Sequence, residues 1–172
     1  MNHSYSPSYE VTPLTMAIIR EQSEDGSARS CILEEQDEFA AYHTPSKIID
    51  NACKFFGSSL RGRQDGTRNI SNITHKAPIA VDPASGMYFF PTASPTSAKC
   101  SWIAHSHINH VNQGPGKQTK IVFKNQKTLL LDVSLGSILN QVQRTAQYRY
   151  VLDNRIKYLQ QHNADMVAEP FP

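Results

Sequence analysis

The fold class predicted from this sequence is α+β: a largely antiparallel β-sheet, a short helix near residues 45–56 and a long C-terminal helix near 136–161. Two observations lead to this prediction. Short apolar segments separated by turn residues fill most of the chain, and helical spacing of apolar residues is confined to those two ranges. Strand-like and helix-like segments do not alternate regularly, as they would in a protein built on a parallel sheet.

The first part of the chain is expected to form an antiparallel meander. Segment 9–20 is rich in Val, Leu, Met and Ile and is interrupted near Pro13. Segment 28–34 follows a Ser-Glu-Asp-Gly-Ser turn at 23–27, and residues 38–43 predict a third short strand.

The next element is the short helix. Thr44 is a candidate N-cap and Pro45 suits the first turn, while Gly57 is well placed to end the helix. The apolar residues that recur at helical spacing, and should face the core, are Ile48, Ile49, Ala52, Cys53 and Phe56. Residues 57–66 are rich in glycine and arginine, and we interpret them as a functional loop.

The remaining strands belong to the second half of the chain. They are expected at 78–81, 87–90, 100–111, 119–124 and 128–133. The Asp-Pro-Ala-Ser-Gly sequence at 82–86 is a strong turn signal, and residues 125–126 should be the turn of a hairpin.

The long C-terminal helix is predicted from a 4-3 spacing typical of a packed helix face. The residues with this spacing are Ile138, Val142, Thr145, Arg149, Leu152, Ile156 and Leu159. We expect a flexible N-terminal arm at 1–8, a single domain at 9–163 and a flexible tail at 164–172.

Charge is unevenly distributed along the chain. Residues 1–50 contain three Lys or Arg and nine Asp or Glu, a balance of −6, whereas residues 51–163 contain fourteen and four, a balance of +10. A basic region at 51–163 that follows an acidic region at 1–50 suggests that the basic region binds a polyanionic partner such as nucleic acid. The alternative is an ordinary solvated surface with an uneven spread of charge.

Several classes of protein are disfavoured. No basic segment followed by an apolar run marks a signal peptide, and no stretch approaches the roughly 20 apolar residues of a membrane span. The three cysteines, Cys31, Cys53 and Cys100, are widely spaced and do not suggest a disulfide framework. The sequence therefore predicts a cytoplasmic protein without membrane partners.

The glycine- and arginine-rich segment is the main candidate site. It does not match a phosphate-binding P-loop, because Arg63 and Gln64, not Lys and Ser or Thr, follow its second glycine. Gly57 and Gly62 would let the backbone approach a partner, while Arg61, Arg63 and Arg68 would reach DNA phosphates or a narrow minor groove. The alternative is that these arginines simply decorate a surface loop.

A zinc site is the second hypothesis. In a strand at 100–111, His105 and His107 would share one face, whereas Cys100 and His110 would lie on the other. Only two ligands would converge, and a structural zinc site needs four. We therefore predict no metal and no cofactor, although Cys53 and His75 could complete a ligand set through the fold.

Catalysis has little support in the sequence. The acidic residues between 51 and 163 are Asp65, Asp82, Asp132 and Asp153. They form no carboxylate pair or nucleophile triad, so we predict that the protein is not an enzyme. No helix-turn-helix signature is visible either.

The middle of the chain resembles the ComK family of competence transcription factors. The motifs are Cys-Lys-Phe-Phe-Gly-Ser-Ser-Leu-Arg-Gly-Arg at 53–63, Thr-His-Lys-Ala-Pro-Ile-Ala-Val-Asp-Pro-Ala-Ser-Gly-Met-Tyr-Phe-Phe-Pro-Thr at 74–92, Cys-Ser-Trp-Ile-Ala-His-Ser-His at 100–107 and Asn-Gln-Val-Gln-Arg-Thr-Ala at 140–146. The similarity runs in the same order from about residue 9 to residue 156.

This resemblance implies an activator of competence (DNA uptake) genes that binds paired A/T-rich boxes, chiefly through the minor groove, as a pair of dimers. It also implies that the protein helps RNA polymerase engage the promoter. Lys54, Lys76, Arg144 and Arg149 are further candidate DNA contacts. The longer tail by which the family's best-known members meet a proteolytic adaptor has no clear counterpart in residues 163–172, which puts adaptor control in doubt. A zinc-stabilised nucleic-acid module and a protein-interaction regulator remain the alternatives.

Overall fold

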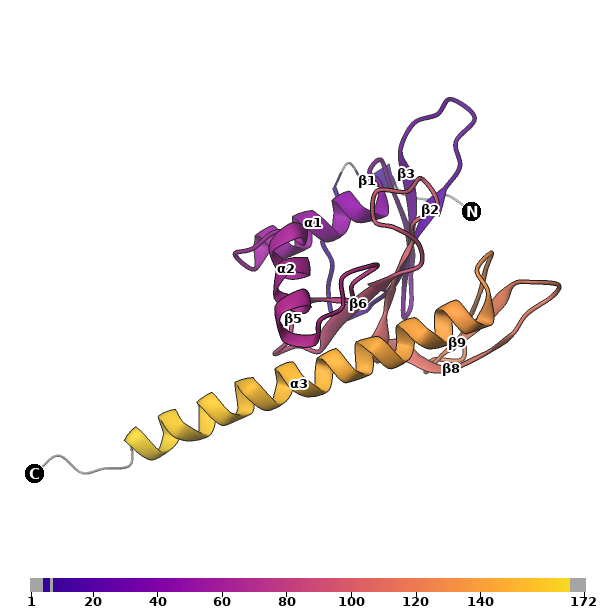
Figure 1. Ribbon diagram of the computed structural model, residues 1–172. Helices are drawn as coiled ribbons and strands as arrows, with labels where there is room; N and C mark the ends of the chain where they lie inside the picture. The colour runs from indigo at the N-terminus through magenta and orange to yellow at the C-terminus, as the bar shows by residue number, and fades with distance from the viewer. Residues whose placement is uncertain (1–4, 7, 168–172) are drawn as a thin grey trace, which may run out of the picture.

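The structure is a computed structural model that describes residues 5–6 and 8–167 of the 172-residue chain. The strands of its large sheet are β1 (Tyr5–Ser6), β2 (Thr15–Glu21), β3 (Arg29–Glu34), β4 (Glu38–Ala41), β5 (Ile79–Asp82), β6 (Met87–Pro91) and β7 (Trp102–Ala104). A small sheet contains β8 (Ile108–Gln113), β9 (Thr119–Phe123) and β10 (Thr128–Leu131). The α-helices are α1 (Pro45–Phe55), α2 (Leu60–Ser71) and α3 (Leu135–Val167) (Figure 1).

The large sheet has the strand order β1-β4-β3-β2-β7-β6-β5, and the small sheet has the order β10-β9-β8. Every described strand pair is antiparallel except β1 with β4. These features confirm the predicted α+β class, the β2–β4 meander and the hairpins β5–β6 and β9–β10. β1 lies inside the segment expected to be a flexible arm; residues 1–4 and 7 of that arm lie outside the described residues.

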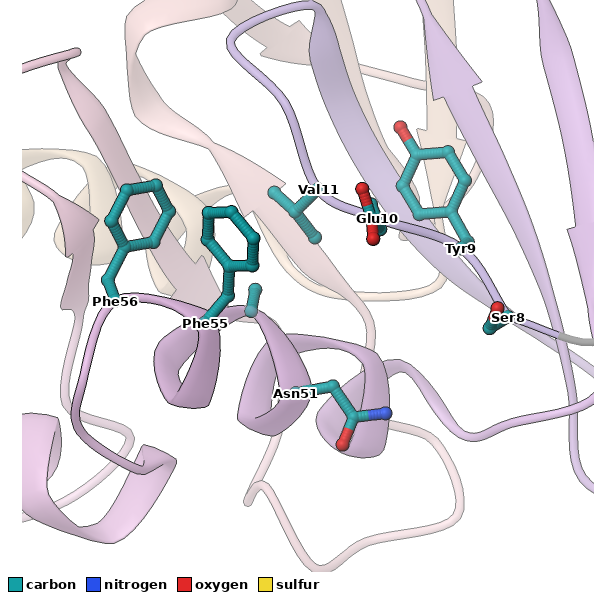
Figure 2. Close-up of a pocket in the computed structure, with 8 residues that line it drawn as sticks. Ser8, Tyr9, Glu10, Val11, Asn51, Phe55 and Phe56 are labelled. Carbon is teal, nitrogen blue, oxygen red and sulfur yellow. The ribbon is translucent and has the colours of Figure 1, made fainter.

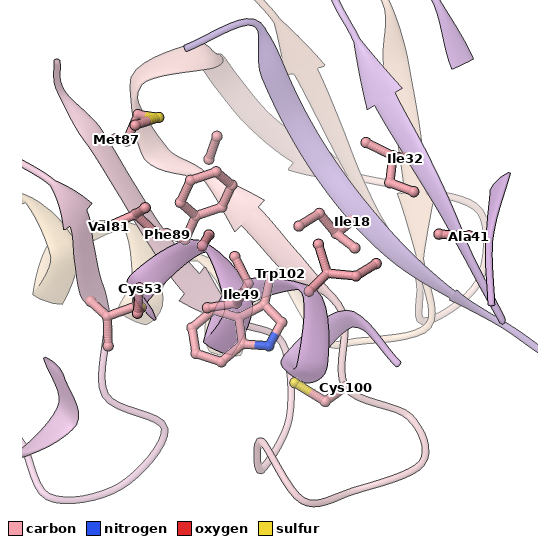
Figure 3. Packing of buried hydrophobic residues seen from close by; sticks show 14 residues of the cluster. Ile18, Ile32, Ala41, Ile49, Cys53, Val81, Met87, Phe89, Cys100 and Trp102 are labelled. Carbon is pink, nitrogen blue, oxygen red and sulfur yellow. The ribbon is translucent and has the colours of Figure 1, made fainter. Parts of the chain in front are cut away.

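Both faces of the large sheet are buried because its side chains alternate between two apolar layers. On one face, Ile18, Phe89 and Trp102 pack with Ile49 of α1, as Figure 3 shows. The Trp102 indole donates a hydrogen bond to Ser46 Oγ at 3.0 Å, which satisfies its polar atom next to the helix. The short helix predicted at 45–56 is thus present and covers this face.

The small sheet and the first part of α3 cover the other face. Ala17, Phe90 and Ile103 of the large sheet pack against Phe123 of β9 and Ile138 of α3. A β-bulge in β2 between Thr15 and Ala17 turns Met16 onto this face as well, so consecutive residues point the same way. The two sheets therefore form a two-layer core closed by helices.

The segment at 57–66 is not a loop, as the glycine and arginine content suggested, but contains the first half of α2. The helix begins because the Ser59 hydroxyl accepts a hydrogen bond from the Gly62 N–H at 3.0 Å. Buried Thr67 then donates a hydrogen bond to the Pro78 carbonyl at 2.6 Å, which fixes α2 beside β5. Capping and packing outweigh the poor helix propensity of two glycines.

The strand predicted at 100–111 is also wrong as a continuous element. A 3₁₀ turn at His105–His107 divides it into β7 of the large sheet and β8 of the small sheet. Ser106 holds this turn by donating to the Gly86 carbonyl at 2.6 Å. The chain passes from one sheet to the other here, so the strand alternation assumed for the histidines does not apply.

The long helix α3 extends beyond its predicted end at residue 161, to Val167, so residues 164–167 of the expected tail are helical and residues 168–172 lie outside the described part. Its spacing prediction holds in the first half, where Ile138 and Thr145 are fully buried. It fails later, since Leu159 is 61% exposed. Figure 1 shows that the last turns of α3 project past the sheets, away from the other described elements, although Leu152 still packs against the cluster of Tyr88 and Tyr148.

Candidate nucleic-acid interface

The predicted site residues lie around the connection between α1 and α2. Gly57 has a φ of +80°, and the N–H groups of Gly57 and Ser58 donate to the carbonyls of Lys54 and Cys53, both at 3.0 Å. This is a Schellman C-cap, which confirms that Gly57 ends α1. The turn is tight, because a Cβ on Gly62 would stand 2.8 Å from Ser58 Oγ.

Asp50 connects the two helices. Its carboxylate accepts a hydrogen bond from the Leu60 N–H at 3.0 Å and pairs with Lys54 Nζ at 2.9 Å. Burial alone would raise the pKa of Asp50, but the Leu60 N–H and the neighbouring lysines outweigh it and hold the pKa below its ordinary value. Lys54 itself is exposed, with its ammonium group at the rim of this connection.

Two of the three predicted arginines lie on the outer side of α2. Arg61 is exposed, and no ion pair or hydrogen bond holds its guanidinium group within the described part of the chain. Arg68 is also exposed and pairs with Asp65 at 3.2 Å one turn earlier. These two arginines are available to an external anion.

Arg63 points the other way, into the protein. Its guanidinium donates to the Val81 carbonyl of β5 at 3.3 Å, and its Nε is buried with no hydrogen-bond partner in the described structure. Its charge acts on Cys53 and Tyr148, which belong to α1 and α3. Arg63 therefore lies where three helices meet β5, and its location favours a structural role.

Arg144 and Lys76 meet at the start of β5. Arg144 donates to Gln141 Oε1 at 2.8 Å and to the His75 carbonyl, and burial lowers its pKa. Gln141 in turn donates to the Lys76 carbonyl at 2.9 Å, and Lys76 has a φ of +47°. This network fixes the loop before β5 on α3 and occupies the guanidinium of Arg144.

Arg149 is similarly occupied. It donates to Ser106 Oγ at 2.7 Å, lies 3.6 Å from the Asp153 carboxylate and stacks 4.9 Å from the centre of the Tyr88 ring. Tyr88 completes the group by donating to Asp153 at 2.6 Å. The structure therefore brings Lys54, Arg61 and Arg68 to the surface and uses Arg63, Arg144 and Arg149 for internal contacts.

An exposed aromatic pair, not predicted from the sequence, lies at the end of α1. Phe55 is 75% exposed and Phe56 is 38% exposed, although Phe56 was expected to face the core. Their rings meet edge to face with centroids 5.1 Å apart. They border a cavity of about 210 Å³ between α1 and residues 8–11 (Figure 2). One signal was available in the sequence: consecutive residues of a helix point about 100° apart, so Phe55 and Phe56 could not both face the centre of the apolar side.

Metal ligation finds no support among the residues that the structure describes, where no three His, Cys, Asp or Glu side chains gather as a ligand set. Burial raises the pKa of Cys53 to about 11, which disfavours the thiolate that binds zinc. His107 instead contacts the Pro13 carbonyl at 2.7 Å and Glu35 at 3.6 Å. Burial lowers the pKa of His105.

The fold and this surface define a class: an α+β protein with exposed arginine and lysine side chains on a two-helix layer. Residues 6–157 match the family described as ComK protein. The chain is also 40% identical over 151 residues to the competence transcription factor of Bacillus subtilis (strain 168), covering 88% of this chain and 78% of that relative. The chain therefore belongs to the ComK family.

Family membership places the chain among transcriptional regulators of competence. No solved structure matches it. Within the described residues, no helix is both long and apolar enough to cross a lipid bilayer.

Proposed function

We propose that this protein is a sequence-specific DNA-binding activator of competence genes that binds double-stranded, A/T-rich promoter DNA chiefly through the minor groove. The observation that carries this proposal is the surface of α2 and its junction with α1, where Arg61 has no internal partner within the described structure and Arg68 and Lys54 flank it. The guanidinium group of Arg61 is the candidate for the groove, because narrow A-tract grooves concentrate negative potential.

The ion pairs of the flanking residues are compatible with DNA binding. Arg68 pairs with Asp65 in exposed positions, and exposed Lys54 pairs with the partly buried Asp50. Ion pairs at a protein surface contribute at most about 1 kcal/mol. Exchanging a carboxylate for a phosphate therefore costs little, and counterion release from the DNA favours the exchange. The phosphate contacts would position the protein on the duplex, and the contact of Arg61 with the minor groove would provide the sequence preference.

The projecting half of α3 is the candidate element for self-association. Tyr150, Tyr158 and Leu159 are 71%, 59% and 61% exposed, and a second copy that covers them would bury apolar area. In this proposal the protein acts in the cytoplasm at the nucleoid as a homo-oligomer, such as a pair of dimers, and helps RNA polymerase engage the promoter. A proteolytic adaptor, if one acts, would use another surface of the domain.

Fluorescence anisotropy tests the proposal, with the full chain titrated onto a duplex carrying paired A/T boxes and onto a G/C-scrambled control across a salt series. We expect preference for the A/T duplex and a slope of log affinity against log salt of several units, about −0.9 for each phosphate neutralised. Equal and weak binding to both duplexes would contradict it. Binding to neither would favour a protein-interaction regulator, and stoichiometric zinc in the purified protein would favour a zinc-stabilised module.

A further inference from the structure

The small sheet lies in a part of the chain without negative side chains. Between Asp82 and Asp132 the sequence contains no Asp or Glu, but five lysines. Four of these, Lys117, Lys120, Lys124 and Lys127, lie on β9 or in the turns at its two ends. The local charge of this element is therefore strongly positive, although the whole chain has a formal net charge of only +2.

The small sheet has one buried face and one outer face. Ile121, Phe123 and Leu131 point into the core shared with the large sheet and α3. Side chains alternate along a strand, so Lys120 and Val122 point outward from β9. The strand register places Asn112 and Leu130 beside Lys120, and His110 beside Val122. The outer face thus combines a half-buried central lysine with amide and imidazole groups and the exposed side chain of Leu130, whereas Val122 is buried.

The polar groups of this surface are free to meet a partner. His110, Asn112, Lys117 and Lys124 are exposed, and no side-chain hydrogen bond or ion pair engages them within the described structure. Lys127 differs, because its ammonium group donates to the Glu34 carbonyl at 3.3 Å.

Two carboxylates at the margins of the small sheet, those of Asp132 and Glu35, contact other residues. Asp132 accepts a hydrogen bond from Gln118 at 2.7 Å, and Glu35 lies 3.6 Å from His107. Neither pairs with Lys117, Lys120 or Lys124. No ion pair within the described structure therefore competes with an external anion for these three lysines.

The turn at residues 114–118, between β8 and β9, is held by several hydrogen bonds, which reduces the entropy lost when a ligand binds. The Gly114 N–H donates to the Gln118 carbonyl at 2.9 Å, and Gln118 donates back to the Pro115 carbonyl at 3.0 Å. Gln113 adds hydrogen bonds to the Gly116 and Gln118 carbonyls, both at 3.0 Å. Lys117 is thus presented from a fixed turn.

We propose that the outer face of β8–β9–β10, with its tip at residues 114–118, is a second DNA-binding surface that contacts the sugar–phosphate backbone. Lysines neutralise phosphates, and asparagine and histidine donate hydrogen bonds to phosphate and sugar oxygens, which are the usual positioning contacts in DNA complexes. The proposal rests on the proposed function, since it assigns a further surface to the same ligand, duplex DNA. The α1–α2 layer and the small sheet cover opposite faces of the large sheet (Figure 1), so substitutions at the two surfaces should act independently.

The test compares full-length variants by the same anisotropy salt series. The triple variant Lys117→Ala, Lys120→Ala, Lys124→Ala should reduce the magnitude of the salt slope by about 2.7, or about 0.9 for each lysine, and weaken binding to both duplexes in parallel. The double variant Lys117→Ala, Lys124→Ala changes exposed positions only and should lose about 1.8. The control is Lys99→Ala, which changes an exposed lysine in the loop before β7, outside the small sheet and α3.

The outcomes separate this proposal from the proposed function. If the wild type prefers A/T DNA but the double variant has the slope of the control, the second surface is wrong and the proposed function stands. If the wild type binds both duplexes equally and the double variant loses slope, the second surface stands and the sequence-specific function is wrong. If the wild type binds neither duplex, both are wrong.

Discussion

The α1–α2 layer and the small sheet both carry clusters of basic side chains, but these side chains differ in whether they have partners within the protein. In the α1–α2 layer, Lys54 and Arg68 have carboxylate partners and Arg63 is directed into the protein. In the small sheet, Lys117 and Lys124 have no such partner in the described structure. The number of basic residues in a segment is therefore a poor measure of the charge that it offers to DNA.

We expect the largest loss of stability when the buried packing between α3 and α2 is removed. Tyr148 is 3% exposed and packs edge to face on Tyr88, with ring centroids 5.8 Å apart. Tyr148→Ala should lower the free energy of unfolding by about 3–5 kcal/mol, because it empties a large buried site. Urea unfolding followed by circular dichroism measures this. Gln147→Ala, at an exposed position of the same helix, should change it by less than about 0.5 kcal/mol.

Substitutions of Arg63 and Arg61 compare an inward and an outward arginine of the same helix, α2. Arg63→Ala should cost about 1–2 kcal/mol of stability, because it removes a hydrogen bond to β5 and side-chain packing, and should leave the salt slope of DNA binding unchanged. Arg61→Ala should leave the stability nearly unchanged and reduce the magnitude of the salt slope by about 0.9. Equal effects of the two variants on both measurements would refute the assignment of inward and outward arginines.

Asp50→Asn tests the link between the helices. It should lower stability at neutral pH by about 1 kcal/mol, because the Leu60 N–H and two lysines lose a charged partner. The pKa of Asp50 is depressed in the folded state, so its contribution is present above the unfolded pKa of about 3.9 and is lost as pH falls through the folded pKa. Unfolding curves of both proteins should therefore converge in acid, and a difference that persists there would contradict the ionic origin.

The smallest effect concerns the tip of the small sheet. Lys117→Ala should change stability by less than about 0.5 kcal/mol, since the side chain is exposed and makes no contact that holds the turn. The same variant should still reduce the salt slope by about 0.9. Thermal unfolding and anisotropy on one preparation separate these two effects, and a large loss of stability would show that Lys117 is structural.

The sequence predicted the elements whose signals are local. Thr44, Pro45 and Gly57 marked the limits of α1, and the turn residues at 82–86 and 125–126 marked two hairpins. It did not predict α2, because Gly62 and Gly66 lower its helix propensity and its stability comes from the Ser59 cap and from packing on other elements. Such contacts join residues far apart in sequence.

The candidate site was predicted only in part, again because its geometry depends on contacts between residues far apart in sequence. Composition identified the arginines of the 57–68 segment, but only the position of α2 against β5 decides that Arg63 points inward while Arg61 is exposed. Arg149 was predicted as a DNA contact from its charge, whereas its stacking on Tyr88 depends on how α3 crosses β6. Residues 83–131 contain no Asp or Glu, which was a sequence signal for the basic character of the small sheet. Summing the charge over residues 51–163 concealed it.

The helix α3 makes the domain sensitive to insertions and deletions in an uneven way. Ile138 is anchored in the layer with the small sheet, and Tyr148 is anchored beside α2. Each residue added between them would advance the helix by about 1.5 Å and rotate everything after it by about 100°, which would remove one anchor or the other from its site. Additions near Leu159 would leave both anchors in place and shift only the part of α3 that follows. The fold should therefore tolerate length changes after Leu159 but not between Ile138 and Tyr148, whatever the amino acids inserted.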